Sequence, residues 1–253
     1  MMGPRISVYV IAFNEIDKIE AALNSVQWAD ELVVIDSHST DGTTALAQKL
    51  GARVEHVVFE GYGRLRNAAI KHCKHEWIFS LDADERCTPE VAEEIKQIVS
   101  GGDESHDYYF VPRRNFFLGR WIRHSGWYPN FRQPQLFKRD AMVYDELPVH
   151  EGFVPISKKP AGFLRSAIWQ FPFKDVGELL RKADRYSTLG ALKLEGKRIS
   201  VWTAFAHGVW AFVKHYIFKR GFLDGGPGLV IAVANFEGTF YRYLKAMRGS
   251  SNG

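Results

Sequence analysis

The sequence predicts an α/β fold with a mostly parallel sheet covered by helices on both faces, followed by a helical C-terminal region. Over the first hundred residues, apolar runs of strand length alternate with segments whose apolar residues recur at helical spacing. After about residue 175 only the helical spacing remains. With 253 residues, 46% of them hydrophobic, the chain can bury a core, and its ordinary composition excludes disorder, collagen and coiled coil as the main class.

The strands and helices are predicted from apolar runs, helical spacing and the turn and capping residues between them. Strands are expected at residues 6–13, 32–35, 54–59 and 77–81. Helices are expected at 15–26, 41–50, 65–73 and 89–99, the last with Thr88 as its cap and Pro89 in its first position. Further helices are expected at 176–194, 202–217 and 229–247, with the Gly-Gly-Pro-Gly cluster at 225–228 as a break.

The net charge of +4 hides an asymmetry along the chain. Residues 1–157 carry 17 Lys and Arg against 23 Asp and Glu, which gives −6, and residues 158–253 carry 16 against 6, which gives +10. We therefore expect two regions with different roles: an acidic one over 1–157, and a basic, mainly helical one over 158–253 that faces an anionic partner. A solvated lysine-rich helical surface is the common alternative for the second region.

Cysteine content and hydropathy suggest a location. Two cysteines cannot form a disulfide framework, which favours a reducing, cytoplasmic compartment. The uncharged runs at 199–213 and 225–236 span 15 and 12 residues. A membrane-spanning helix needs about 20 predominantly apolar residues, so no such helix is expected.

Acidic residues follow the predicted second and fourth strands. Asp36 ends one, and Asp82 and Asp84 flank Ala83 at the end of the other. Ligands of parallel sheets bind beyond the carboxyl ends of the strands, so the position strengthens an otherwise weak Asp-x-Asp signal. Carboxylates suit a hard divalent ion that also contacts phosphate oxygens, and a solvated acidic turn is the alternative. Neither a Walker-type motif nor G-x-G-x-x-G is present, which disfavours P-loop and dinucleotide-binding proteins.

Four motifs in the first 90 residues resemble the inverting family 2 glycosyltransferases with the GT-A fold. They are Val10-Ile-Ala-Phe-Asn-Glu15, Leu32-Val-Val-Ile-Asp-Ser-His-Ser-Thr-Asp-Gly-Thr43, Gly63-Arg-Leu-Arg-Asn67 and Leu81-Asp-Ala-Asp-Glu85. The resemblance implies a nucleotide-sugar donor, Mg²⁺ or Mn²⁺, and inversion at the anomeric carbon. It also implies that residues 1–157 form the nucleotide-sugar-binding and catalytic domain, and that residues 158–253 lie on the acceptor or membrane side.

Four later motifs resemble one subgroup, the lipopolysaccharide core-biosynthesis glucosyltransferases that act on the inner-core heptose. They are Gln135-Leu-Phe-Lys138, Leu147-Pro-Val-His-Glu151, Lys182-Ala-Asp-Arg-Tyr-Ser187 and Lys219-Arg-Gly-Phe-Leu-Asp-Gly225. The subgroup has a His near Ile168-Trp-Gln-Phe171, where this chain has none, so no metal or phosphate role is carried over to that position.

The resemblance also implies roles for individual residues. Those expected to bind the donor nucleotide are Phe13, Asn14, Asp36, Arg66, Asn67 and Asp82. Asp84, with Asp82, would hold the metal. His150 and Arg132 are expected to contact the acceptor or the diphosphate.

Direct displacement requires a base on the face opposite the departing diphosphate. The family places that carboxylate well after the metal motif, where Asp145, Glu146 and Glu151 are candidates. Glu151 is favoured because Val-His-Glu resembles the subgroup, and Glu146 is second. A surface salt bridge is an equally good interpretation of a single Glu.

Two segments suggest partners. Residues 113–139 hold seven Lys and Arg, seven aromatics and no acid, which fits nucleic acid or an anionic sugar acceptor, and the absence of a nucleic-acid module favours the acceptor. Some of these aromatics would simply be core. Residues 202–217 place aromatics on one helical face near Lys214, as in an interfacial membrane helix or a core-packing helix.

Together these observations predict transfer of a hexose, glucose by preference, from a uridine diphosphate sugar to a lipid-linked oligosaccharide. The expected location is peripheral, on the cytoplasmic face of the inner membrane. The alternatives are a peptide, protein or polyprenyl-phosphate acceptor for the same enzyme class, or a non-enzymatic module that binds nucleotide or nucleic acid.

Overall fold

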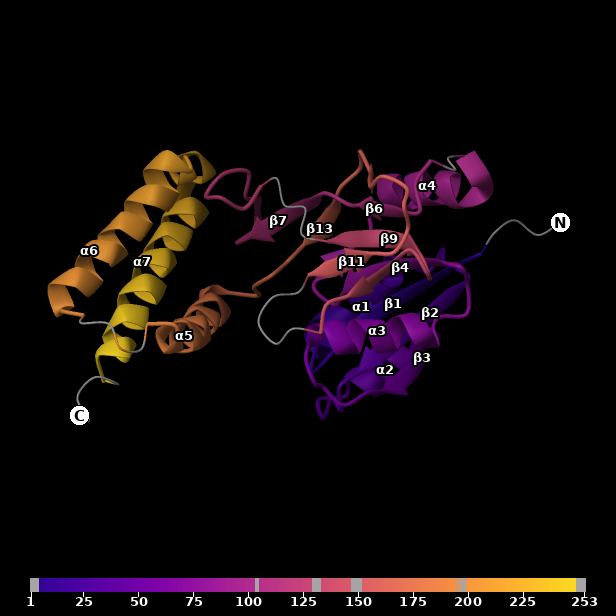
Figure 1. The fold of residues 1–253 in the computed structure, drawn as a ribbon, viewed down its shortest axis with the longest axis horizontal. Helices are drawn as coiled ribbons and strands as arrows, with labels where there is room; N and C mark the ends of the chain where they lie inside the picture. The colour runs from indigo at the N-terminus through magenta and orange to yellow at the C-terminus, as the bar shows by residue number, and fades with distance from the viewer. Residues whose placement is uncertain are drawn as a thin grey trace. The chain divides into compact units, whose positions relative to one another are not determined.

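The computed structural model describes residues 5–102, 105–128, 133–146, 152–194, 196 and 199–248. The chain divides into two compact units (Figure 1). The first comprises Met1–Arg113 and Asn130–Gln170, and the second comprises Arg114–Pro129 and Phe171–Gly253. The expected domain boundary at residue 157 lies within the first unit, and the functional assignment of the two regions stays a prediction.

The first unit is built on one sheet. Among the described residues it has seven strands in the order β12-β6-β9-β4-β1-β2-β3. Their bounds are β1 Ile6–Ala12, β2 Glu31–Asp36, β3 Arg53–His56, β4 Trp77–Asp82, β6 Tyr108–Phe110, β9 Pro134–Lys138 and β12 Gly162–Phe163. β1 to β4 run parallel, whereas β9 pairs antiparallel with both β4 and β6. The predicted mostly parallel α/β sheet is confirmed.

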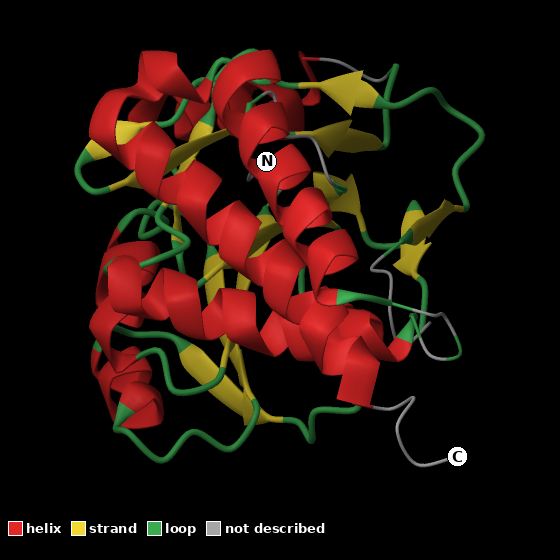
Figure 2. Cartoon of the chain, turned by 90° about the vertical axis from the view of Figure 1, so that its left-hand side faces the viewer, coloured by secondary structure: helices red, strands yellow, loops and turns green. Residues whose placement is uncertain are grey.

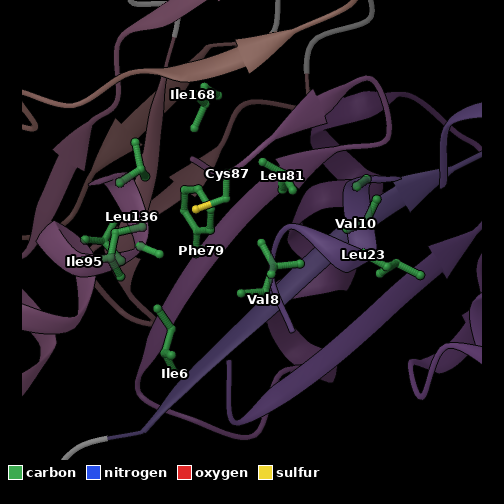
Figure 3. Packing of buried hydrophobic residues seen from close by; sticks show 14 of the residues in the cluster. Ile6, Val8, Val10, Leu23, Phe79, Leu81, Cys87, Ile95, Leu136 and Ile168 are labelled. Carbon is green, nitrogen blue, oxygen red and sulfur yellow. The ribbon is translucent and has the colours of Figure 1, made fainter. Parts of the chain in front are cut away.

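Helices cover both faces of this sheet because the central strands are apolar on both sides. One core cluster joins alternate residues of β1, such as Val8 and Val10, to α1 Ile16–Asn24, α2 Thr43–Lys49 and α4 Pro89–Gln97. Figure 3 shows part of this cluster, with Leu23 of α1 and Ile95 of α4. The intervening β1 residues, such as Tyr9, pack with α3 Tyr62–His72 on the other face. Thr88 caps α4 as predicted, its Oγ1 accepting from Val91 N at 3.3 Å.

Shorter strands complete the first unit. β5 Glu85–Arg86 pairs antiparallel with β13 Ile168–Gln170. β10 Met142–Tyr144 pairs antiparallel with β11 Phe153–Pro155. The β10–β11 pairing joins the two ends of the segment that carries the candidate base residues.

The second unit is mainly helical. It contains α5 Val176–Leu192, α6 Val201–Val213 and α7 Gly225–Arg248, and α7 packs against both α5 and α6 (Figures 1 and 2). β7 Arg113–Phe117 and β8 Arg120–Trp121 form a hairpin. None of the described helices is long and apolar enough to cross a membrane.

The predicted 202–217 helix corresponds to α6, which ends at Val213, and to a π-helical turn over 214–218 that follows it without a break. The structure corrects the start of the last helix. The Gly-Gly-Pro-Gly cluster, predicted to precede that helix, forms its first turn, because α7 starts at Gly225. Pro227 fits there since the first N–H groups of a helix have no intrahelical acceptor to lose.

Candidate functional site

Polar residues gather where the parallel strands of the first unit end. The register places Asp36 of β2 beside Ala12 of β1 and His56 of β3, and Asp82 of β4 beside Ile11 of β1. The strands that carry Asp36 and Asp82 therefore end at one edge of the sheet, as predicted for a ligand site.

Asp36 is a fully buried carboxylate with spare hydrogen-bonding capacity. Its Oδ2 accepts from Ser39 N at 2.9 Å and lies 3.2 Å from Nδ1 of His56. Its Oδ1 is buried and has no hydrogen-bond partner among the described residues. A buried acceptor without a hydrogen bond raises the free energy of the folded state, so a donor from a ligand would stabilise this site.

Asn14 and Phe13 play different parts beside Asp36. Asn14 has a left-handed backbone with φ +54°, and its side-chain Oδ1 accepts from Thr40 N at 2.8 Å. Its own N–H donates to Ser39 Oγ at 2.8 Å. Asn14 thus joins the turn after β1 to the loop after β2, while Phe13, 60% exposed, leaves an aromatic surface open to a ligand.

Two histidines at this edge were missed by the sequence reasoning. The rings of His38 and His56 stack with their centroids 5.6 Å apart, next to Asp36. The predicted third strand continued to residue 59, whereas β3 ends at His56, so this histidine was not recognised as a residue at the carboxyl end of a strand.

Asp82 is held by a buried arginine. Arg66, which is 3% exposed, donates from Nη2 to Asp82 Oδ1 at 2.8 Å and from Nη1 to Ser80 Oγ at 2.9 Å. The side chain of Asp82 is 26% exposed. Arg66 therefore orients Asp82 in this structure, and its predicted contact with the donor stays a prediction.

Asp84 faces Gln170 of β13, a residue that the sequence analysis did not select. The Nε2 atom of Gln170 lies 3.4 Å from Oδ1 and 3.3 Å from Oδ2 of Asp84. The β13–β5 register sets Gln170 opposite Glu85, which explains this approach. Gln170 is only 8% exposed, and it occupies the segment where the subgroup's histidine was expected. That missing histidine was the signal that could have found it.

Glu85 stabilises the acidic turn through a hydrogen bond from the backbone of Asp82. It is fully buried, its Oε2 accepts from Asp82 N at 2.9 Å, and its Oε1 lies 2.6 Å from Nε of Arg113. Burial raises the pKa of Glu85 to about 7, although the Arg113 charge opposes this rise. Gln135 Nε2 also donates to Oε2, at 2.9 Å. Glu85, Arg113 and Gln135, which support the Asp-x-Asp turn, are thus far apart in sequence, so no local motif could identify them together.

The Gly-Arg-Leu-Arg-Asn motif on α3 joins the acidic turn to the segment after β10. Asn67 Nδ2 donates to Tyr144 O at 2.9 Å, and its Oδ1 accepts from Tyr144 N at 2.9 Å. A Cβ atom on Gly63 would lie 1.8 Å from the carbonyl oxygen of Asp145, so only glycine allows this approach. Asn67 uses its amide on the backbone here, and its expected role in donor binding stays a prediction.

Only part of the predicted catalytic and acceptor set can be placed. Arg132, His150 and Glu151 lie outside the described residues. Glu146 is described: it is exposed, and its Oε2 lies 3.2 Å from Nε of Arg64. Asp145 N donates to Gly152 O at 3.1 Å, which closes the segment between β10 and β11.

The residues at the acidic turn fit a hard cation in part. The described residues contain no group of three or more His, Cys, Asp and Glu arranged to hold a metal. Asp84 offers carboxylate oxygens, which are ligands that Mg²⁺ accepts, and Gln170 donates toward them through Nε2. Mg²⁺ commonly uses only one or two carboxylates and completes its shell with water and phosphate oxygens. The donor set therefore fits an ion shared with a diphosphate.

The mostly parallel α/β sheet with an Asp-x-Asp turn at its carboxyl edge defines a GT-A-like glycosyltransferase. The chain belongs to glycosyl transferase family 2, because the model of that family matches residues 7–160. Family membership removes the alternative of a non-enzymatic binding module.

Relatives and one solved structure extend this comparison. The chain is 30% identical to the lipopolysaccharide core biosynthesis glycosyltransferase LpsC of Rhizobium meliloti, over 96% of this chain and 91% of LpsC. It is 27% identical to an uncharacterized glycosyltransferase of Rickettsia conorii, over 97% of this chain and 91% of the relative. Glucosyl-3-phosphoglycerate synthase from Mycobacterium tuberculosis, solved with Mn²⁺ and uridine diphosphate, overlaps 44% of this chain and 45% of its own, at 26% identity and a TM-score of 0.39.

Proposed function

We propose that this glycosyltransferase moves a hexose, glucose by preference, from a uridine diphosphate sugar to the inner-core heptose of a lipopolysaccharide core, with inversion. The observation that carries the proposal is the pairing of two acidic sites at one sheet edge: buried Asp36 after β2, and Asp82 and Asp84 after β4. One site suits a nucleoside, and the other suits a metal-bound diphosphate.

The nucleoside half of the donor would lie against β1 and β2. Asp36 Oδ1 is an acceptor without a partner among the described residues, so it can take a hydrogen bond from a base N–H or a ribose hydroxyl. The exposed ring of Phe13 offers an apolar surface for the base. Asn14 would hold both loops in place through its bonds to Ser39 and Thr40.

The diphosphate half would lie at the acidic turn with Mg²⁺ or Mn²⁺. Asp84 would hold the ion, with Gln170 orienting its carboxylate, and Asp82 would contact the ion or the ribose. The ion would neutralise charge on the departing diphosphate. Arg66 fixes the orientation of Asp82, so the carboxylate need not reorganise when the donor binds.

Inversion requires a carboxylate that takes the acceptor hydroxyl proton. We propose Glu151 for this role, with Glu146 second, and His150 and Arg132 beside the acceptor or diphosphate. Gly63 and Asn67 anchor the chain at Tyr144 and Asp145, immediately before Glu146. This anchoring supports a fixed position for Glu146 relative to α3.

The second unit would face the acceptor and the membrane. The bulky residues of α6 are exposed, with Trp202 80% and Trp210 56% exposed, while the small Ala204 and Gly208 are buried. Lys214 and Lys219 follow, and residues 199–223 contain no Asp or Glu. Exposed aromatics beside cations suit the surface of an anionic bilayer. This arrangement supports peripheral binding at the cytoplasmic face of the inner membrane.

The acceptor assignment is supported by the likeness to LpsC, whose name states a role in lipopolysaccharide core biosynthesis. A peptide, protein or polyprenyl phosphate remains the alternative acceptor. A screen of acceptor classes with uridine diphosphate glucose, followed by the mass of the product, would separate these proposals. Transfer to a peptide and none to a heptose oligosaccharide would overturn the acceptor proposal.

The metal proposal has its own test. We expect Asp84→Asn to lower uridine diphosphate release by at least about 100-fold, because the carboxylate charge that holds the ion is lost. Exposed Asp140→Asn is the matched control and should retain full turnover. Unchanged turnover of Asp84→Asn would refute the metal role of this residue.

A further inference from the structure

The hairpin of the second unit carries two arginines that lie over the ring of one tryptophan. Arg114 lies on β7 and Trp121 on β8, and Arg123 follows β8 by two residues. The Cζ atoms of Arg114 and Arg123 lie 4.7 Å and 4.6 Å from the indole centroid of Trp121. We name these three residues the Trp121 clamp.

The hairpin segment that carries this clamp is rich in cations. Residues 114–128 include three arginines and no Asp or Glu. Neither Arg114 nor Arg123 forms an ion pair with any described acidic residue. Given their distances to the indole centroid, the two Cζ atoms are less than 10 Å apart. This separation is within the Debye length of about 10 Å at 0.1 M salt. The two cations therefore repel each other, and an anion between them would relieve that repulsion.

A buried carboxylate holds the segment that carries Arg123. Asp224, only 1% exposed, accepts from the backbone N–H of Arg123 at 3.1 Å and of His124 at 3.0 Å. It also accepts from Ser125 Oγ at 2.8 Å. The segment then turns through Ser125 and Gly126, both with positive φ. Asp224 is thus fully engaged with the backbone and the Ser125 hydroxyl, and the Arg123 guanidinium stays available.

The position of the arginines over the indole favours a particular kind of ligand. A guanidinium that contacts an indole through its planar face keeps the N–H groups at its edges free to bind an anion. Two such forks suit a phosphate monoester, which carries a charge of about −1.5 to −2 at pH 7 and three acceptor oxygens. Stacking also fixes both side chains in advance, which lowers the entropic cost of binding.

We propose that the Trp121 clamp binds a phosphate monoester carried by a saccharide. Binding of the phosphate stands on the clamp alone, and its assignment to a phosphate on the sugar acceptor rests on the proposed function. Arg114 and Arg123 supply the charge-assisted hydrogen bonds, and Trp121 holds both guanidinium groups in place.

The test is calorimetric titration of glucose 6-phosphate into the full chain, without donor, against unphosphorylated glucose. The double variant Arg114→Gln with Arg123→Gln should weaken binding at least tenfold. The control Arg185→Gln with Lys193→Gln, which removes one exposed cation in α5 and one just after it, should change binding less than twofold. The double variant Arg114→Lys with Arg123→Lys keeps the charge but loses the fork, so intermediate affinity is expected. Circular dichroism melts establish that each variant is folded.

Three results would overturn the proposal. One is binding of the double glutamine variant within twofold of the unmodified chain. The second is equal affinity of the unmodified chain for glucose and for glucose 6-phosphate. The third is a double glutamine variant that no longer binds phosphatidic acid vesicles but binds glucose 6-phosphate as the unmodified chain does, which would identify a lipid headgroup as the ligand. Hydrolysis of uridine diphosphate glucose without acceptor is measured in parallel, so failure of the transferase proposal is distinguished from failure of the clamp.

Discussion

The guanidinium of Arg66 binds the Asp82 carboxylate at 2.8 Å while its second nitrogen binds Ser80 at 2.9 Å. The arginine is on α3 and the two acceptors are on β4, so this contact joins the helix to the end of the strand that carries the acidic turn. The relationship identifies Arg66 as a positioning residue for Asp82.

Replacing Arg66 should harm both stability and turnover. Arg66→Met would leave Asp82 without its cation, with an expected loss of about 2 kcal/mol in the free energy of unfolding, below the 3–5 typical of fully buried pairs because Asp82 is partly exposed. Turnover should fall at least about tenfold because Asp82 loses its orientation. Urea unfolding and uridine diphosphate release measure the two effects. Lys71→Met, exposed on the same helix, is the control, and equal effects of both variants would contradict the prediction.

Gly63→Ala should disturb the segment before the candidate base. The added Cβ would overlap the carbonyl oxygen of Asp145, which forces α3 and the segment after β10 apart. We expect a stability loss of about 1–3 kcal/mol and a lower kcat with nearly unchanged donor affinity. Gly226→Ala introduces a methyl group into open space at the start of α7 and should be neutral. A donor affinity that falls as much as kcat would argue against a positioning role.

Because residue 170 is a glutamine and not a histidine, its protonation does not change the metal affinity of this chain. An amide does not titrate, whereas a histidine placed there would lose metal affinity as pH falls through about 6.5. We expect Gln170→Ala to weaken Mn²⁺ binding roughly tenfold in the presence of uridine diphosphate. Gln170→His should bind Mn²⁺ more weakly at pH 5.5 than at pH 8, relative to the unmodified chain.

Isothermal titration of Mn²⁺ at both pH values measures these effects without turnover. Gln97→His, on the exposed surface of α4, is the control and should behave as the unmodified chain. Identical pH dependence for Gln170→His and the control would place residue 170 outside the metal site.

The exposed aromatics of α6 should govern vesicle binding. Trp202→Ser with Trp210→Ser removes two large apolar side chains from the proposed bilayer contact, and at least about a tenfold loss of partitioning is expected. Sedimentation with phosphatidylglycerol vesicles at low salt measures it. Phe59→Ser, half exposed in the first unit, is the matched control. Equal partitioning of all three proteins would refute the proposed contact.

Asp107 should contribute stability that disappears in acid. Partial burial alone would raise its pKa, but the Ser157 hydroxyl, Lys159 and Lys138 outweigh burial and lower the pKa to about 2. Because the folded pKa is below the unfolded value of about 3.9, the contribution is complete above pH 4 and is lost as pH falls toward 2.

We expect Asp107→Asn to lower the free energy of unfolding by about 1 kcal/mol at pH 7 and to have a clearly smaller effect near pH 2, where the folded carboxyl is half protonated. Chemical unfolding across this range measures the difference. The exposed Asp140→Asn should show no comparable difference, and a constant effect of Asp107→Asn down to pH 2 would exclude the ionic origin.

Local pattern was sufficient for β1 to β4, for most helices and for the acidic edge of the sheet, but it did not predict β6, β9 and β12, which complete the same sheet. Apolar periodicity and the Thr88 cap are properties of adjacent residues, so they predicted the elements before any contact was known. Asp36, Asp82 and Asp84 followed, because the ends of parallel strands meet at one edge. The glycines at 225–228 misled the boundary of α7, since a helix start and a helix break share the same residues.

Only the tertiary structure decided which side chains support that edge. Glu85 and Arg113 meet across 28 positions of sequence, and Asp84 and Gln170 across 86, through strand pairings that no local pattern specifies. The same holds for Asn67 and Tyr144, whose contact depends on the close approach that Gly63 allows. The sequence by itself determined the elements and the family motifs, because these depend on neighbours. The partners of each motif residue depend on sheet register and on the distance between packed backbones, and these exist only in the folded chain.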